Sequence, residues 1–179
     1  MNRLRRIVLV LAATAALCSA QSMAHGADKS PFAEQAAKAG YTGVQTAALQ
    51  AQVDDVVAQT GGTQVALNQV AWKGGVTTLV LPGETRARRL DQSPAQVEAW
   101  PYGCSYLYFC TYANRDYSGA QTFLYDCVST AVLPFRSYVN NQTRGTIARW
   151  GGHVVGQSKP APSGSPFDTI TDYITVKPC

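Results

Sequence analysis

The stretch Tyr112-Ala-Asn-Arg-Asp-Tyr117-Ser-Gly119 decides the fold of this chain. It contains an aromatic residue, four residues, a second aromatic residue, one residue and then glycine. The first ring can pack across a folded-over hairpin while the second anchors the turn. Glycine can take a left-handed backbone conformation that a Cβ would strain. The stretch therefore predicts a tightly folded β-hairpin.

Short runs with the composition of β-strands surround this hairpin. From Trp100 onward, segments rich in Tyr, Phe and Val are separated by Gly, Asn, Asp, Ser and Pro. A spacing of about eight to twelve residues between such turn signals is typical of an antiparallel sandwich or barrel. Ser158 to Pro166 reads as a loop. The expected strands are 106–113, 121–127, 130–134, 145–150, 152–157 and 170–177.

The residues before this region predict a small extension. Apolar residues recur at helical steps over 44–60, and Gly61-Gly62 ends that helix. A β-hairpin over 63–82 follows, with one strand from Thr63 to Trp72, a turn at Lys73-Gly74-Gly75 and a returning strand. Ser93-Pro94-Ala95 then predicts a linker. We therefore divide the chain into an extension, 25–95, and a main domain, 96–179.

The N-terminus predicts a signal peptide over residues 1–24. Three arginines precede an apolar run, Ile7 to Leu17, and small residues allow cleavage after Ala20 or Ala24. The run is shorter than the roughly 20 residues that a membrane-spanning helix needs. Leu17 also stands where a lipobox usually has Gly, Ala or Ser. We expect a secreted, extracellular protein that has no membrane association after cleavage.

The charge of the chain lies largely in this leader. The formal net charge is +4, but three of the fifteen basic residues leave with the signal peptide, so twelve basic groups face eleven acidic ones. No basic stripe remains to suggest nucleic-acid binding. The one local cluster, Arg86-Ala-Arg88-Arg89, reads either as a solvated loop or as a dibasic nicking site.

Four cysteines remain after the signal peptide has been removed, which in an exported chain implies two disulfides. Three pairings are available. We expect Cys104–Cys110 as a short local loop and Cys127–Cys179 as a clamp on the C-terminus. The spacing lacks the Cys-x-x-Cys pairs and the neighbouring histidines of a zinc site.

The segment from Tyr102-Gly103-Cys104 to Trp150, continued to Cys179, resembles the Streptomyces metalloproteinase inhibitor family. Tyr112, Tyr117 and Gly119 match the Greek-key hairpin motif of the βγ-crystallin fold. The resemblance covers somewhat under half of the chain, and Trp150–Gln157 repeats the motif in outline only. It implies a mainly β protein: a βγ-crystallin-like Greek-key sandwich with two disulfides, preceded by a small helix-plus-β-hairpin extension. It also implies inhibition of an extracellular metalloprotease.

A calcium site is a further candidate. In calcium-binding βγ-crystallins, two Asn or Asp, any residue, Ser or Thr, and then Ser supply oxygen ligands. Asn140-Asn141-Gln142-Thr143-Arg144 fits four of these positions, but Arg144 adds a cation where the last hydroxyl should stand. Asn140, Asn141 and Thr143 are thus candidate ligands of a weak calcium site. Alternatively, their side chains satisfy a turn by hydrogen bonds to the backbone.

Catalytic motifs do not stand out. Nucleophilic catalysis usually needs a histidine base, and the mature chain offers His153, with His25 at the cleavage point. The chain contains no His-Glu-x-x-His and no Gly-x-Ser-x-Gly. We expect that the protein is not an enzyme. A glycosidase would need two converging carboxylates, and nothing selects a pair among Asp116, Asp126, Asp168 and Asp172.

Three functions compete. The first is a monomeric inhibitor of extracellular proteases that presents a rigid loop, either near Cys104–Cys110 or at residues 114–119. The second is a binder of the cell envelope or of carbohydrate, including a toxin-like binder, in which exposed tyrosines serve as platforms. The third is a calcium-stabilised structural protein. The candidate platform residues are Tyr102, Tyr106, Tyr108 and Tyr138.

Overall fold

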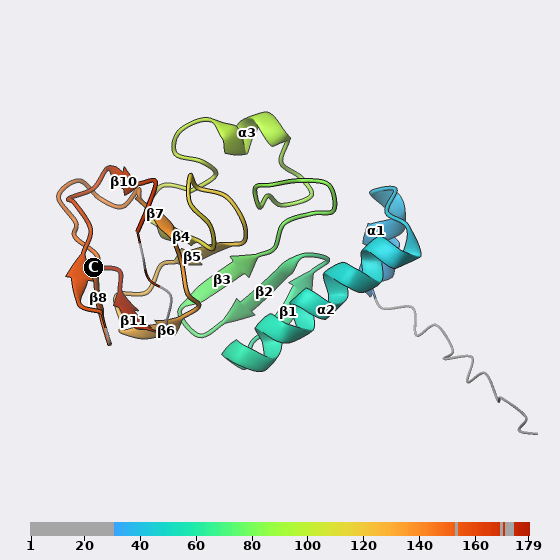
Figure 1. Ribbon diagram of the computed structural model, residues 1–179, viewed down its shortest axis with the longest axis horizontal. Coiled ribbons are helices and arrows are strands. Elements are labelled where there is room, and N and C mark those ends of the chain that lie inside the picture. The colour runs from blue at the N-terminus through green and yellow to red at the C-terminus, as the bar shows by residue number, and fades with distance from the viewer. Residues whose placement is uncertain (1–30, 153, 169, 171–173) are drawn as a thin grey trace, which may run out of the picture.

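Two antiparallel sheets dominate the computed structural model, which describes residues 31–152, 154–168, 170 and 174–179 (Figure 1). One sheet has seven strands and the other has four. The helices of the described part are few: α1 (Pro31–Lys38), α2 (Gly43–Thr60) and the short α3 (Pro94–Glu98). The expected mainly β class is therefore confirmed. The predicted signal peptide, 1–24, lies outside the described residues.

Local signals explain the bounds of α2. The Thr42 hydroxyl accepts a hydrogen bond from the backbone N–H of Gln45, and the Gln45 side chain accepts one from the Thr42 N–H. This reciprocal cap satisfies amides that have no partner within the helix. Gly61 ends the helix with a φ of 64°. The helix predicted over 44–60 is confirmed.

The large sheet has the order β1-β2-β3-β5-β4-β7-β10. The hairpin expected over 63–82 is wrong in detail, because the run Thr63–Trp72 forms two strands with a turn at Leu67-Asn68. The buried Asn68 side chain fixes this turn by donating hydrogen bonds to the Leu79 and Arg88 carbonyls. The strands are β1 (Thr63–Ala66), β2 (Gln69–Trp72), β3 (Gly75–Thr78), β4 (Phe109–Tyr112), β5 (Gln121–Leu124), β7 (Ser137–Asn140) and β10 (Ser163–Ser165).

The smaller sheet has the order β6-β11-β8-β9. Its strands are β6 (Thr130–Val132), β8 (Arg149–Gly151), β9 (Gly156–Gln157) and β11 (Ile174–Lys177). The groups β4–β7 and β8–β11 have the same topology. In each group the first strand lies between the second and the fourth, and the third strand crosses to the other sheet. The two groups therefore interlock, and each sheet contains strands from both.

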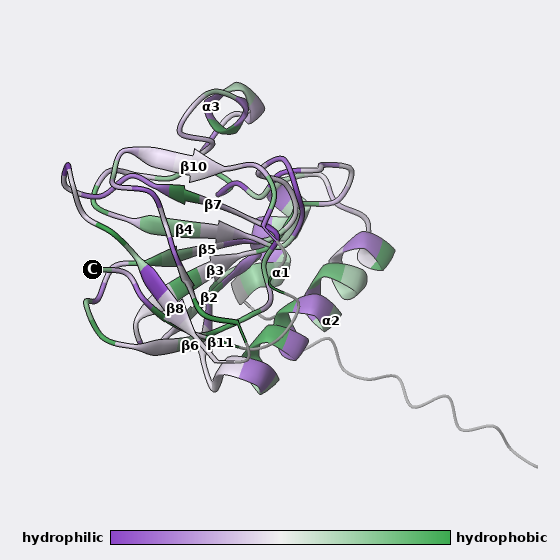
Figure 2. Cartoon of the chain, turned by 60° about the vertical axis from the view of Figure 1, so that its left-hand side comes forward, coloured by the Kyte–Doolittle hydropathy of each residue, from purple (hydrophilic) through white to green (hydrophobic). Residues whose placement is uncertain are grey.

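The extension belongs to the same sheet as the main domain. β3 pairs with β5 over four residues, so β1, β2 and β3 continue the large sheet beyond β5. One hydrophobic cluster joins Leu49 and Val53 of α2 with Trp72, Phe109 and Trp150. In Figure 2 the large-sheet strands β10, β7, β4, β5, β3 and β2 follow one another in this order, with hydrophobic (green) stretches on β7, β4 and β5.

A second, smaller cluster lies on the opposite face of the large sheet. It contains Cys104, Cys110, Tyr112 and Val139, with partly buried tyrosines packed around them. The turns that follow α3 pack on this face, because Tyr102 and Cys104 belong to the cluster and the Tyr112 hydroxyl donates to the Tyr102 carbonyl. This covered face carries the residues of the candidate site.

Candidate functional site

Both disulfides have the expected pairing. Cys104 bonds to Cys110 with a Cα–Cα distance of 5.9 Å, and Cys127 bonds to Cys179 with a Cα–Cα distance of 5.1 Å. The first pair is fully buried in the smaller cluster, whereas Cys127 is exposed. Because Cys110 lies on β4, the short disulfide anchors a surface loop directly to a strand inside the large sheet.

This loop contains a tight turn of residues Ser105–Tyr108. The Tyr108 N–H donates a hydrogen bond to the Ser105 carbonyl over 3.3 Å, and Leu107 at the third position has a φ of 77°. A positive φ at that position is the mark of a type II turn, which normally has glycine there. Leucine therefore occupies a backbone conformation that its Cβ strains.

Asn141, the residue after β7, is hydrogen-bonded to the turn through both its backbone and its side chain. The Leu107 N–H donates to the Asn141 carbonyl over 2.9 Å, and the Asn141 N–H donates to the Tyr108 carbonyl over 3.0 Å. The Asn141 side chain donates to the Cys104 carbonyl over 2.9 Å. Three hydrogen bonds and a disulfide thus fix a loop of only a few residues.

The tip of the turn is apolar and exposed. Tyr106 is 64% exposed and Leu107 is 54% exposed. The base is packed, because the Tyr108 ring lies edge-on to Phe123 at 5.8 Å and to Tyr125 at 6.0 Å. A small hollow of about 150 Å³ lies beside the base. The geometry combines a rigid base with two large side chains that are more than half exposed.

The Tyr112–Gly119 stretch forms the connection between β4 and β5. The Tyr112 and Tyr117 rings meet edge to face at 5.7 Å. Gly119 has a φ of 78°, and a Cβ there would lie 2.7 Å from the Asn114 side-chain nitrogen. The Tyr112 hydroxyl donates to the Tyr102 carbonyl over 2.9 Å, and burial raises the pKa of Tyr112 far above its usual value. This hairpin is therefore a packed element, and through Tyr112 it holds the backbone at Tyr102, just before Cys104.

Arg86 clamps the same hairpin from the extension. Its guanidinium donates to the Tyr117 carbonyl over 2.6 Å and lies 5.3 Å from the centre of the Tyr102 ring. The Tyr102 ring stacks on Tyr117 at 4.1 Å. Burial raises the pKa of Tyr117 as well. Residues that the sequence placed in separate domains therefore pack as one unit.

The candidate sugar-platform tyrosines have different surroundings. Tyr138 is buried against Phe109, Tyr102 is half-buried on Tyr117, and Tyr108 is packed as described above. Of the four, Tyr106 has the most exposed ring. An aromatic side chain that the sequence analysis did not single out for binding, Trp100, is 50% exposed and contacts Tyr102 edge to face.

The candidate calcium residues hold backbone together. The Asn140 side chain is fully buried and donates to the Thr146 carbonyl, the Ser158 hydroxyl and the Lys159 carbonyl. Asn141 supports the turn, and Thr143 is exposed. Hydrogen bonding by the two asparagines, the alternative to calcium, is thus present, and calcium binding stays a prediction. In the part of the chain that the structure describes, no three His, Cys, Asp or Glu side chains gather as a metal site.

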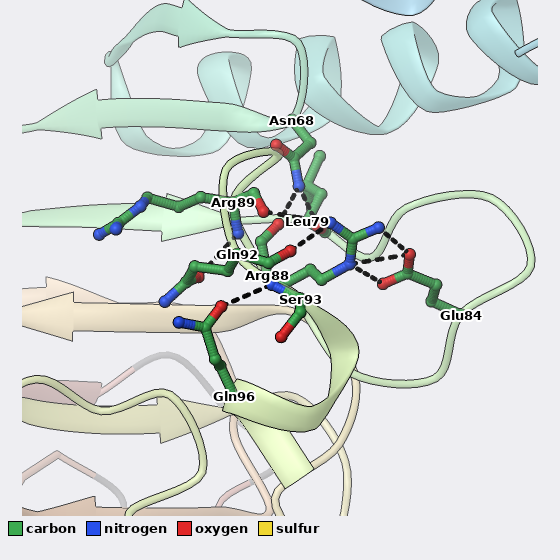
Figure 3. A network of polar contacts seen from close by, with 8 residues as sticks. All are labelled: Asn68, Leu79, Glu84, Arg88, Arg89, Gln92, Ser93 and Gln96. Carbon is green, nitrogen blue, oxygen red and sulfur yellow. Dashed lines mark hydrogen bonds and ion pairs between the residues drawn. The ribbon is translucent and has the colours of Figure 1, made fainter. Parts of the chain in front are cut away.

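The dibasic pair Arg88-Arg89 lies within a polar network (Figure 3). Arg88 forms an ion pair with Glu84 at 2.6 Å and donates to the Gln92 carbonyl over 2.7 Å. Asn68 donates to the Arg88 carbonyl over 2.9 Å. This bonding fixes both the side chain and the carbonyl of Arg88, so the geometry argues against a nicking site. The side chain of Arg88 is only 15% exposed, so the expected solvated loop is also wrong for this residue.

Comparisons of the chain with family models, with curated proteins and with solved structures find no match. His153, the histidine considered as a catalytic base, lies outside the described residues. Among the helices that are described, none is both long and apolar enough to cross a membrane.

The sequence pointed to the Cys104–Cys110 loop but not to the backbone of Leu107. One feature of the sequence could have pointed to a strained residue: Ser105-Tyr-Leu-Tyr108, between the cysteines, contains no Gly or Asn to take a positive φ. A tight turn there is often of a type that requires a positive φ, so a bulky residue must then take the strained position.

Proposed function

We propose that this chain is a secreted inhibitor of extracellular proteases, and that the turn Ser105–Tyr108 is its contact with the protease. One observation carries the proposal. Two large apolar side chains, Tyr106 and Leu107, are exposed on a turn that the buried Cys104–Cys110 disulfide and Asn141 hold rigid. Exposed apolar residues on a fixed base are typical of a binding surface.

Rigidity gives such a turn its affinity. A flexible loop loses about 0.5–1.5 kcal/mol for each side chain that becomes immobile on binding, whereas a preorganised turn loses less. The turn carries no charged residue between its two cysteines. It therefore suits a protease with an apolar pocket. The resemblance to the Streptomyces metalloproteinase inhibitor family favours a metalloprotease as the target.

The proposal includes a βγ-crystallin-like Greek-key fold for the main domain. Two four-strand groups that each pass their third strand to the opposite sheet support it. The close packing of Tyr112, Tyr117 and Gly119 in the first hairpin supports it further. Export is proposed from the N-terminal leader, and two disulfides are compatible with an oxidising, extracellular environment.

The test is inhibition of a thermolysin-like metalloprotease by the oxidised protein, with a trypsin-like serine protease as control. We expect nanomolar inhibition of the metalloprotease alone. Tyr106→Ala/Leu107→Ala should abolish it, whereas Val154→Ala/Val155→Ala, in the connection between β8 and β9 of the smaller sheet, should leave it intact. Both pairs are exposed, so neither should unfold the protein. Inhibition of neither protease would refute the proposal.

A second candidate function is binding of cell-envelope carbohydrate. Trp100 favours it, because its half-exposed indole lies close to Gly164, where a Cβ would come within 3.1 Å of the ring, and an exposed indole can stack on a sugar. Retention of the protein on purified cell wall, lost in Trp100→Ala and kept in Tyr106→Ala, would support this function. Retention that does not depend on Trp100 would exclude this site.

A further inference from the structure

Four residues other than glycine have a left-handed backbone in the described part of the chain: Tyr102, Leu107, Asp116 and Tyr117. Their φ angles lie between 54° and 77°. This conformation brings Cβ close to the carbonyl oxygen, so a side chain other than glycine needs compensation to remain there.

Compensation is visible for three of the four. The Tyr102 and Tyr117 rings stack on each other at 4.1 Å, and both contribute to the smaller hydrophobic cluster. Asp116 has a short polar side chain of the kind that tolerates this region, and its N–H donates to the Pro166 carbonyl over 2.7 Å. For these three residues, contacts within the folded protein compensate the strain of the positive φ.

Leu107 differs from these three residues. Its side chain is more than half exposed and belongs to neither hydrophobic cluster. Glycine would take the same backbone conformation without strain and would keep the hydrogen bond from this N–H to Asn141. The isolated molecule therefore gives no reason for a leucine at this position, and a partner that contacts its side chain does.

We infer that Leu107 determines the specificity of the turn: its side chain enters an apolar pocket of the target protease that accepts an aliphatic side chain. This inference rests on the proposed function. Tyr106, its more exposed neighbour, lies at the second position of the turn and is not strained. Tyr106 contributes to the surrounding contact surface.

The same geometry indicates that the protease does not cut the turn. A substrate segment enters a protease cleft in an extended form. An extended chain spans about 10 Å from the first to the fourth residue, whereas a β-turn holds these Cα atoms within about 7 Å. The Leu107 N–H is also bound to Asn141, and Cys104–Cys110 ties both sides of the Tyr106–Leu107 bond together. The turn therefore fills the cleft as a shape that does not open into a substrate.

The test compares three single variants of the oxidised protein against a thermolysin-like metalloprotease. We expect Leu107→Gly to raise the inhibition constant by at least about 30-fold, and Tyr106→Ala to raise it by less than about 5-fold. Leu107→Met should stay within about 5-fold of the parent, because it retains an apolar side chain of similar volume. The urea midpoint of Leu107→Gly should be no lower than that of the parent, which separates a lost contact from a lost fold.

Mass spectrometry after prolonged incubation with an equimolar amount of protease reports on cleavage. The expected result is an intact Tyr106–Leu107 bond in the inhibited complex. Undiminished inhibition by Leu107→Gly would overturn the role of Leu107 while leaving the proposed function in place. A complex in which this bond is cut would overturn the uncut mechanism. Inhibition of no protease by the parent protein would overturn the proposed function and this inference together.

Discussion

Removal of each disulfide should affect stability and inhibition differently: the long disulfide contributes more to the free energy of unfolding, and the short one more to inhibition. Removing a disulfide restores loop-closure entropy to the unfolded chain, and the effect grows with the length of the loop. Cys104 and Cys110 are 6 residues apart, whereas Cys127 and Cys179 are 52 apart. The loop-entropy relation then gives a loss of about 2 kcal/mol for the short loop and about 4 kcal/mol for the long one.

The effect on inhibition should have the opposite order. Cys104→Ala/Cys110→Ala frees the exposed turn and removes two buried sulfur atoms, which adds a cavity term of about 1 kcal/mol. Cys127→Ala/Cys179→Ala releases the end of β11, which lies in the smaller sheet. We expect the first variant to lose most of its inhibition and the second to keep it at temperatures where the protein stays folded.

Urea unfolding followed by tryptophan fluorescence gives the free energy of unfolding of each variant. Inhibition constants for the same thermolysin-like metalloprotease are measured at a temperature at which both variants are more than nine-tenths folded. A larger loss of stability from the short disulfide would refute the loop-entropy reasoning. Full inhibition by Cys104→Ala/Cys110→Ala would refute the claim that a rigid turn is the contact element.

Three further predictions concern the frame around the turn. Gly119→Ala should lower the free energy of unfolding by about 2–4 kcal/mol, because the added Cβ would both clash with the Asn114 side chain and sit on a backbone with a positive φ. Gly83→Ala is the control: its φ is 86° but the space around it is open, so it should lower the free energy of unfolding by only about 1–2 kcal/mol. Equal losses in urea unfolding would contradict the clash. Burial raises the pKa of Tyr112 in the folded protein above the 10.0 of an exposed tyrosine. Above about pH 10 the tyrosine therefore ionises in the unfolded chain before it ionises in the folded one, and this favours unfolding. The contribution of Tyr112 to stability is complete below about pH 10 and is lost as the pH rises. The free energy of unfolding should therefore fall above about pH 10, and Tyr112→Phe should make that fall shallower by up to about 1.4 kcal/mol per pH unit; an unchanged slope would contradict the assignment. Trypsin should not cut the bond after Arg88 in the parent protein, because the Asn68 side chain donates a hydrogen bond to the Arg88 carbonyl and fixes this bond. In Asn68→Ala, trypsin should cut there, and mass spectrometry of the fragments detects the cut. Early cutting of the parent protein would exclude a fixed loop.

The elements with strong local signals could be predicted from the sequence. Helix α2 has apolar residues at helical spacing, a capping box formed by Thr42 and Gln45 at its start, and Gly61 just past its end. Strand β4 has aromatic residues between two turn signals. In each case the residues that determine the element lie inside it or beside it, so a single sequence contains the information.

Strands that depend on distant partners could not be predicted. All four residues of β7 (Ser137–Asn140) are buried, so the strand lacks the alternation that marks a half-exposed strand. β10 consists of Ser-Gly-Ser in a segment expected to be a loop, and it is a strand because it pairs with β7. Long-range pairing made both strands, and no local pattern reports it.

The candidate site divides in the same way. The cysteine spacing indicated which loop is tied down, since a six-residue separation suits a local disulfide. The direction in which that loop presents its side chains depends on the backbone of Leu107, which has a positive φ and whose turn is hydrogen-bonded to Asn141. A contact between segments more than thirty residues apart cannot be read from either segment alone.

The position of Cys110 explains why the extension matters for the turn. On β4 this residue lies in a row with Val139 of β7, Phe123 of β5 and Val76 of β3. The extension supplies β3, so that β5 is an interior strand and not an edge that frays. Arg86 of the same extension reaches over to the hairpin that follows β4. The stiffness of a surface turn a few residues long therefore comes from a sheet that spans both parts of the chain, and residues 31–95 of the extension help to hold the turn that carries Leu107.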